Sequence, residues 1–153
     1  MSVFRKLLSL CVAVLCVMSF TACSQSGSSA SFFPTDYGFS VQLPESVQEN
    51  IRYDLSNREV GDETINTINV VYQGETGEAN ILTFEEMSSA MWEQMQSEGG
   101  PLPTELGASE DGRVVVMYPL QSNPYEAGTA DADAVDLFVS ESSIVTESFQ
   151  FLQ

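Results

Sequence analysis

The sequence contains no histidine, and its one lysine and three cysteines all lie within the first 23 residues. Without histidine there is no imidazole base for a Ser–His or Cys–His relay. Without a cysteine beyond residue 23, the rest of the chain has no thiol nucleophile and no Cys-based tetrahedral zinc site. Without lysine there is no Schiff-base amine and no Walker-type phosphate lysine. Carboxylates, hydroxyls and guanidinium groups are left to carry any chemistry.

Basic side chains of any kind are scarce. Beyond residue 22, Arg52, Arg58 and Arg113 stand against all 22 acidic residues, which gives a formal charge of −19. Nucleic-acid binding needs Lys or Arg to replace counterions on the phosphates, and an anionic lipid surface would repel such a domain. We therefore expect no nucleic-acid partner. The charge is typical of a soluble, exposed surface, and attraction of cations or basic partners is the alternative.

The chain begins with two basic residues, Arg5 and Lys6, followed by an apolar run over residues 7–20. Its 14 residues fit the roughly 7–15 of a signal-peptide core and fall short of the about 20 that span a bilayer. Phe20-Thr21-Ala22-Cys23 then places small side chains before a cysteine, and a Ser-rich tract follows. This order resembles a bacterial lipoprotein signal peptide with its lipobox.

The resemblance implies a diacylglyceryl group on Cys23 and a further acyl chain on its amine, which together anchor a protein stably. We expect a signal peptide over residues 1–22, the lipidated Cys23 with a Ser-rich linker over 23–31, and one domain over 32–153. The protein would be extracytoplasmic and held at the cell membrane by lipid. Cleavage without lipidation and an uncleaved anchor are the alternatives. Cys11 and Cys16 lie in the apolar run and would leave with it.

Alternating apolar residues predict strands over residues 37–43, 51–55, 64–73 and 79–84, with a turn over 74–77. The capping-box spacing of Thr83 to Glu86 predicts a helix that ends at Gly99-Gly100-Pro101. Residues 105–109 and 113–119 flank Glu110-Asp111-Gly112, which predicts a hairpin.

The remaining segments predict a loop over 122–128, a helix over 129–141 and a last strand over 144–151. The inner face of that helix would carry Ala134, Val135, Phe138 and Val139. Residues 114–118 are nearly all apolar and predict a central strand. The order predicts an α+β fold with an antiparallel sheet between helical layers.

Two segments resemble PsbP-like domains. Tyr37-Gly38-Phe39-Ser40-Val41-Gln42-Leu43-Pro44-Glu45 is similar to their opening strand, and residues 144–151 are similar to their closing strand. The resemblance implies an α/β/α sandwich over residues 32–153. It transfers no activity and no functional residue, because members of that family bind very different partners.

Paired carboxylates are the first candidate for chemistry, because glycoside hydrolysis uses two of them at a fixed separation. Glu85-Glu86 and Glu110-Asp111 are adjacent pairs, but neighbours in sequence point to different faces. We interpret the first pair as helix-start capping and the second as a hairpin tip. A carboxylate-dependent glycan hydrolase remains an alternative function.

Asp131, Asp133 and Asp136, with Glu126 nearby, form the candidate metal site, because hard oxygen ligands suit Ca²⁺. The glycine and closing glutamate of an EF-hand loop are absent from their places. We favour the interpretation that Asp131 and Asp133 lie in the first helical turn, where the helix dipole stabilises negative charge. A calcium-dependent structural or adhesion module remains a third alternative.

Met87, Met91 and Met95 recur every four residues beside Trp92. The stripe predicts the core face of a helix, with an adaptable docking groove as the alternative. Arg52 and Arg58 are expected to balance local acids. Taken together, the sequence predicts a lipid-anchored, monomeric, non-enzymatic binding or accessory domain without a cofactor, which contacts an unidentified envelope protein.

Overall fold

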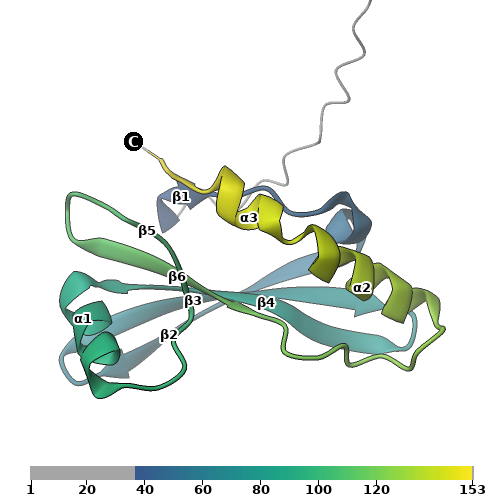
Figure 1. The fold of residues 1–153 in the computed structure, drawn as a ribbon, viewed down its shortest axis with the longest axis horizontal. Helices are drawn as coiled ribbons and strands as arrows, with labels where there is room; N and C mark the ends of the chain where they lie inside the picture. The colour runs from purple at the N-terminus through teal and green to yellow at the C-terminus, as the bar shows by residue number, and fades with distance from the viewer. Residues whose placement is uncertain (1–36, 153) are drawn as a thin grey trace, which may run out of the picture.

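The computed structural model describes residues 37–152, and its centre is a five-stranded antiparallel sheet (Figure 1). The strand order is β2-β3-β4-β6-β5. The bounds of these strands are β2 Ile51–Val60, β3 Glu63–Gly74, β4 Gly77–Ser88, β5 Thr104–Ala108 and β6 Arg113–Pro119. A separate two-stranded pair joins β1 Phe39–Ser40 to β7 Gln150–Phe151. The helices are the 3-10 helix η2 Glu45–Asn50, α1 Ser89–Glu98, α2 Ala130–Glu141 and α3 Ser143–Ser148. The predicted α+β class with an antiparallel sheet is confirmed.

Tight turns join neighbouring strands where the sequence predicts them. Residues 74–77 connect β3 to β4, and the turn at Asp111-Gly112 connects β5 to β6. Gly112 has a φ of 83°, which only glycine adopts at no steric cost. β2 is longer than predicted, because its backbone pairing with β3 continues through polar residues as far as Val60.

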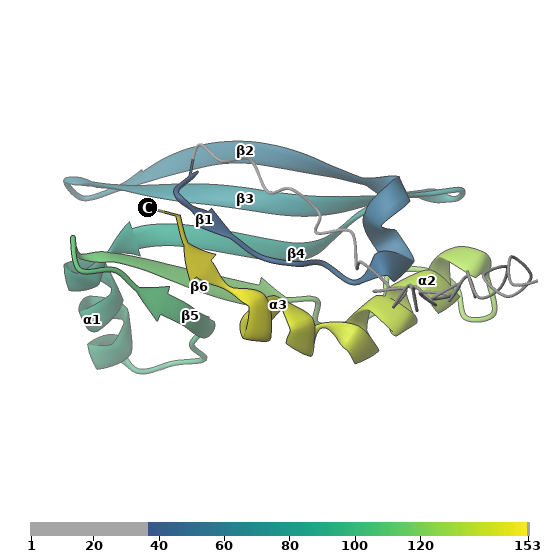
Figure 2. The same cartoon turned by 90° about the horizontal axis from the view of Figure 1, so that it is seen from above.

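The main core lies on the face of the sheet that η2, α2 and α3 cover, which we call the closed face (Figures 1 and 2). Phe84 of β4 packs there against Phe39, with ring centroids 5.9 Å apart. From α2, Val135 and Phe138 are buried against the same cluster. Ala134 is partly buried, but Val139 is exposed, so the inner face of α2 is narrower than predicted.

We call the opposite face of the sheet the half-open face. Figure 1 shows α1 on this side, at one end of the sheet. Beneath α1 lies a second core cluster of buried residues: Ile65, Met87, Met91, Trp92, Val114 and Val116. Away from α1, no helix among residues 37–152 packs on this face. The second helical layer predicted from the PsbP-like resemblance is therefore limited to one end.

The start of α1 differs from the prediction. Thr83 to Glu86 belong to β4, which pairs with β6 through Ser88, so the capping-box spacing has no role there. Ser88 is the N-cap instead, and its hydroxyl accepts a hydrogen bond from Met91 N at 3.1 Å. The long-range pairing with β6 overrides the local helix signal. The helix ends at Glu98, as the following glycines predict.

The closing strand predicted over residues 144–151 is wrong for most of its length. Residues 143–148 form α3, which buries Val145, and only Gln150–Phe151 pairs as a strand. The opening strand is also short. Phe39, Val41 and Leu43 are buried in alternation, as predicted. Only Phe39–Ser40 pairs with another strand, because β7 is two residues long.

Candidate functional site

The part of the half-open face beyond α1 is a polar surface, and we call it the open surface. Cross-strand register places Asn69 of β3, Thr83 of β4 and Tyr118 of β6 in one row across it. The next row towards α1 contains Thr67, Glu85 and Val116. These residues alternate with the apolar residues of the closed face, so their side chains lie on the side of the sheet opposite the main core.

A β-bulge organises the amide and hydroxyl groups of this surface. In a regular strand, Asn80 and Thr83 would point to opposite faces. The register shifts between Val70 and Val71, which pair with Leu82 and Asn80, and this shift brings Asn80 and Thr83 to the same face. Bulges commonly re-aim side chains in this way.

Asn69, Asn80 and Thr83 then form a closed triangle of hydrogen bonds. Asn80 Nδ2 donates to Asn69 Oδ1 at 3.1 Å and to Thr83 Oγ1 at 2.8 Å. Thr83 Oγ1 donates to Asn69 Oδ1 at 2.8 Å. The triangle fixes the three side chains in place and leaves the amides with further donor and acceptor capacity.

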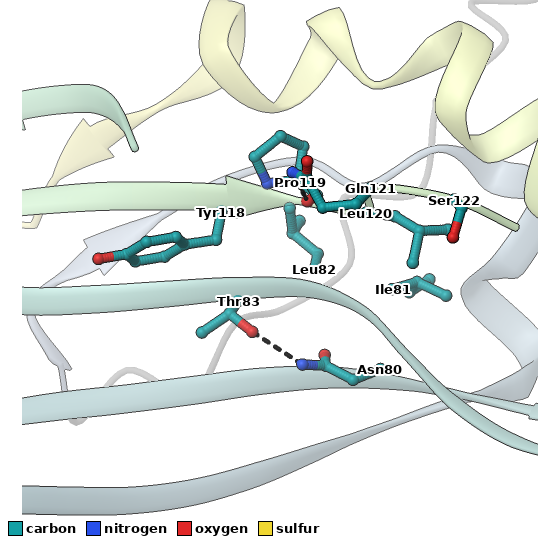
Figure 3. A pocket seen from close by; sticks show the side chains of 9 residues that line it. All are labelled: Asn80, Ile81, Leu82, Thr83, Tyr118, Pro119, Leu120, Gln121 and Ser122. Carbon is teal, nitrogen blue, oxygen red and sulfur yellow. Dashed lines mark hydrogen bonds between the residues drawn. The ribbon is translucent and has the colours of Figure 1, made fainter. Parts of the chain in front are cut away.

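A pocket of about 280 Å³ lies beside this triangle (Figure 3). β6 ends at Pro119, opposite Leu82 of β4, whereas the first part of β4, from Gly77, extends beyond that point. The chain after β6 therefore separates from β4, and the pocket forms there. Its polar lining comes from Asn80, Thr83, Gln121 and Ser122, and Tyr118 adds an aromatic wall. The pocket thus offers hydrogen-bonding groups around a small hollow.

At the α1 end of the open surface, Glu85 is almost fully buried, with 7% of its surface exposed. Arg58 Nη2 lies 3.2 Å from its Oε1, and Tyr118 donates its hydroxyl to Oε2 at 3.0 Å. Burial and the charge of Glu85 raise the pKa of Tyr118 to about 12. The phenol therefore stays protonated and remains a donor at physiological pH.

Both arginines of β2 balance local acids, as predicted. Arg58 pairs with Glu85, while Arg52 contacts Asp54 and lies 2.6 Å from Glu78. The pKa of Glu78 is lowered by its hydrogen bond with Arg52.

The adjacent acidic pairs do not form a two-carboxylate site with each other. Glu85 faces the open surface, while Glu86 points to the other face and pairs with Arg113 Nη1 at 3.3 Å. The predicted capping role of this pair is wrong, because both residues lie within β4. Glu110 and Asp111 lie at the tip of the β5–β6 hairpin, as predicted.

Asp131 lies in the first turn of α2 but points into the protein, with 3% of its surface exposed. Its Oδ2 accepts from Thr76 N at 3.0 Å and from Thr76 Oγ1 at 2.8 Å, and its Oδ1 accepts from Glu75 N at 3.0 Å. The hydroxyl hydrogen bond from Thr76 is the largest cause of its lowered pKa. Asp131 therefore fixes the β3–β4 turn to α2.

The other candidate calcium ligands are arranged differently. Asp133 and Asp136 are exposed on α2, and Asp136 accepts a hydrogen bond from Asn123 at 2.8 Å. Glu126 is exposed in the preceding loop. Within residues 37–152, no group of three or more acidic, His or Cys side chains is placed to hold a metal ion. The structure uses Asp131 to fix the turn and does not bring the three aspartates together.

The methionine stripe is divided between two elements. Met87 lies in β4, while Met91 and Met95 lie on α1, and all three pack in or against the second core cluster. Trp92 packs there too and donates its Nε1–H to Glu105 Oε2 at 2.7 Å. These residues form core, so the predicted core interpretation holds and the docking-groove alternative does not.

Cys23 lies outside the described residues, together with the signal peptide and linker expected from the sequence. In the described part of the chain, no helix is long and apolar enough to cross a membrane. The anchor thus stays a prediction from the sequence.

Comparisons with known proteins give this chain no relative. No family model, curated protein or solved structure matches it significantly. The PsbP-like resemblance therefore also stays a prediction.

The sequence pattern alone does not identify the open surface. It predicts strands through Asn69, Asn80 and Tyr118 and a helix start at Thr83, and it does not bring the four side chains to one face. The alternation of Thr67 and Asn69 with Ile68 and Val70 indicates one solvated face, but the bulge that adds Asn80 has no glycine or proline to mark it.

Proposed function

We propose that this protein is an extracytoplasmic lipoprotein, anchored through Cys23, whose domain works by binding a partner on its open surface. The observation that supports binding most strongly is the fixed triangle of Asn69, Asn80 and Thr83 beside a pocket of about 280 Å³. A few convergent polar groups at the edge of a concave site are typical of recognition sites.

The groups on this surface favour recognition over hydrolysis. A glycosidase needs one carboxylic acid that donates a proton and a second, ionised carboxylate. Glu85 forms an ion pair with Arg58 and accepts a hydrogen bond from Tyr118, and Glu105 accepts the indole hydrogen bond of Trp92. Asp54 and Glu78, which lie on the same face, both contact Arg52, so these four carboxylates are engaged in structural contacts.

The anchor is proposed from the sequence order around Cys23, and the acidity of the domain supports it. A domain with a formal charge of −19 beyond residue 22 has no electrostatic attraction to an anionic membrane, so a lipid would have to hold it there. The partner we propose is another envelope protein rather than nucleic acid.

Acyl labelling tests the anchor. Cells that express the full chain are fed an alkyne fatty acid, and the protein is compared with Cys23→Ala and with Cys16→Ala as the matched control. We expect label on the wild type and on Cys16→Ala and none on Cys23→Ala. Label that persists on Cys23→Ala would refute lipidation at this residue.

Site-specific photocrosslinking in intact cells tests the open surface. A photoreactive residue replaces Gln121, at the exposed rim of the pocket, or Ser140, on the exposed side of α2, as control. We expect a discrete adduct with an envelope protein from position 121 and none from position 140. The same adduct from both positions, or from position 140 alone, would contradict binding at this surface.

A further inference from the structure

The two edges of the main sheet are protected very differently. β5 is five residues long, has a bulge between Glu105 and Gly107, and follows Pro101 and Pro103. Short edges, bulges and prolines all prevent the pairing of an edge with another chain. This edge is therefore blocked.

β2 forms the other edge and lacks those devices (Figure 2). It has ten residues, contains no glycine or proline, and pairs with β3 without any register shift. Residues 54–59 are all exposed, including Leu55 with 47% of its surface accessible. Within residues 37–152, no strand pairs with its outer side. A long, regular, exposed edge is a template for another strand.

Charged side chains can also prevent an edge strand from pairing with another chain, but the charges along β2 cancel. Arg52 and Arg58 stand with Asp54 and Glu59, so this strand is neutral in a strongly acidic chain. Two of the three arginines beyond residue 22 lie here. The edge thus repels a second copy of the chain less than the rest of the surface does.

Symmetric pairing of β2 with a second copy allows only certain registers. Opposite residues must point to the same face, so moving the centre by one residue shifts the pairing by two residues. Only centres at residues 54–57 pair seven or more residues of Ile51–Val60 with the other copy. Centring the pair on Ser56 places Asp54 opposite Arg58 of the other copy, twice by symmetry. Centring it on Leu55 places Arg52 opposite Arg58 of the other copy. Centring it on Asp54 places Asp54 opposite Asp54 of the other copy. Both arrangements bring like charges together. Centring it on Asn57 leaves the charges of Asp54 and Arg58 without opposite partners.

We propose that two copies of this chain associate edge to edge through antiparallel pairing of β2 with β2, centred on Ser56. The pairing forms one continuous sheet of ten strands with both open surfaces on the same side. It departs from the monomer expected from the sequence. Because the proposal depends on β2 alone, it can fail or hold independently of partner binding at the open surface.

Charge reversal tests the register. The chain from residue 23, with Cys23→Ser, is compared by sedimentation equilibrium with its Asp54→Arg and Arg58→Asp variants. Each variant places like charges opposite each other at two symmetric positions, so we expect association at least about tenfold weaker. Mixing the two variants restores both opposite-charge pairs, and we expect the mixture to associate about as tightly as the parent.

The mixing experiment separates the register from any loss of folding. Arg58→Asp also removes the partner of Glu85, but a misfolded variant would not be rescued by mixing. A parent that stays monomeric at all concentrations would overturn the proposal. So would variants that associate like the parent, or a mixture that stays monomeric.

Disulfide trapping gives a second readout that leaves the charges unchanged. Ser56→Cys in the same Cys23→Ser chain would place two thiols on directly opposite residues, where the Cα separation of about 4.5–5.5 Å suits a disulfide. Asn57→Cys is the matched control, because its symmetry mate is displaced by two residues along the partner strand, about 7–8 Å away and beyond the reach of a disulfide. We expect rapid dimer formation only with Ser56→Cys. Equal trapping at both positions, or none at position 56, would overturn the register.

Discussion

Replacing Gly74 by alanine tests how tightly Asp131 holds the β3–β4 turn. An alanine Cβ would lie 2.7 Å from Cγ and Oδ1 of Asp131 and 2.8 Å from Oδ2. These distances are shorter than van der Waals contact, so either the turn or the carboxylate must move. Asp131 cannot move without weakening its hydrogen bonds to Glu75 and Thr76.

The cost of Gly74→Ala follows from that overlap. Overpacking at a well-packed position costs about 1–3 kcal/mol. We expect the free energy of unfolding to fall by about 2 kcal/mol, near the middle of that range, because hydrogen bonds hold both carboxylate oxygens of Asp131 in place. Urea denaturation of the wild type and the variant measures the loss as a lower transition midpoint with an unchanged slope.

A double-mutant cycle decides whether the overlap is the cause. In an Asp131→Ala background the carboxylate is absent, so Gly74→Ala should cost little there. A Gly74→Ala change that is harmless in the wild type, or that costs the same in both backgrounds, would show that the overlap with Asp131 is not the cause.

Four further measurements follow from the same contacts. The pKa of Asp131 is lowered chiefly by the Thr76 hydroxyl, so its stabilisation is complete above the ordinary value of 3.8 and is lost as pH falls through the lower folded value. The stability difference between wild type and Asp131→Asn should thus shrink on acidification below 3.8, and a constant difference would contradict this. Because the oxygens of Asp131 are already engaged, Ca²⁺ should leave the melting temperature unchanged, and a rise abolished by Asp131→Asn would contradict that. Ser88→Ala should cost about 1 kcal/mol and fray the start of α1 in NMR shifts, since it removes the N-cap; an unchanged helix start would argue against the cap. Ultraviolet titration of the tyrosines should show one phenol with a pKa of about 12 that disappears in Tyr118→Phe and moves down in Glu85→Gln; a titration unaltered by both changes would contradict the assignment.

The sequence predicts what short-range chemistry determines. The turns over residues 74–77 and at Asp111-Gly112 depend on nearby glycine and aspartate, and both occur where predicted. The end of α1 at Gly99 is local in the same sense. The first turn of α2 also follows from its cap, because Thr129 accepts a hydrogen bond from Ala132 N.

What the sequence does not reveal depends on contacts between distant residues. Thr83 to Glu86 look like a helix start, but pairing with β6 holds them in a strand. Asp131 looks like a solvated helix-start residue or a calcium ligand, yet its partners lie 55 and 56 positions earlier in the chain. The open surface needs a bulge and three adjacent strands in register, and no single segment contains that information.

The proposed function depends most on the lipid at Cys23, and mass spectrometry of the protein purified from membranes tests that lipid directly. We expect an N-terminal peptide that begins at Cys23 and carries the mass of a diacylglyceryl group on the sulfur. An N-terminal peptide that begins elsewhere, or one that begins at an unmodified Cys23, would contradict lipidation at this residue.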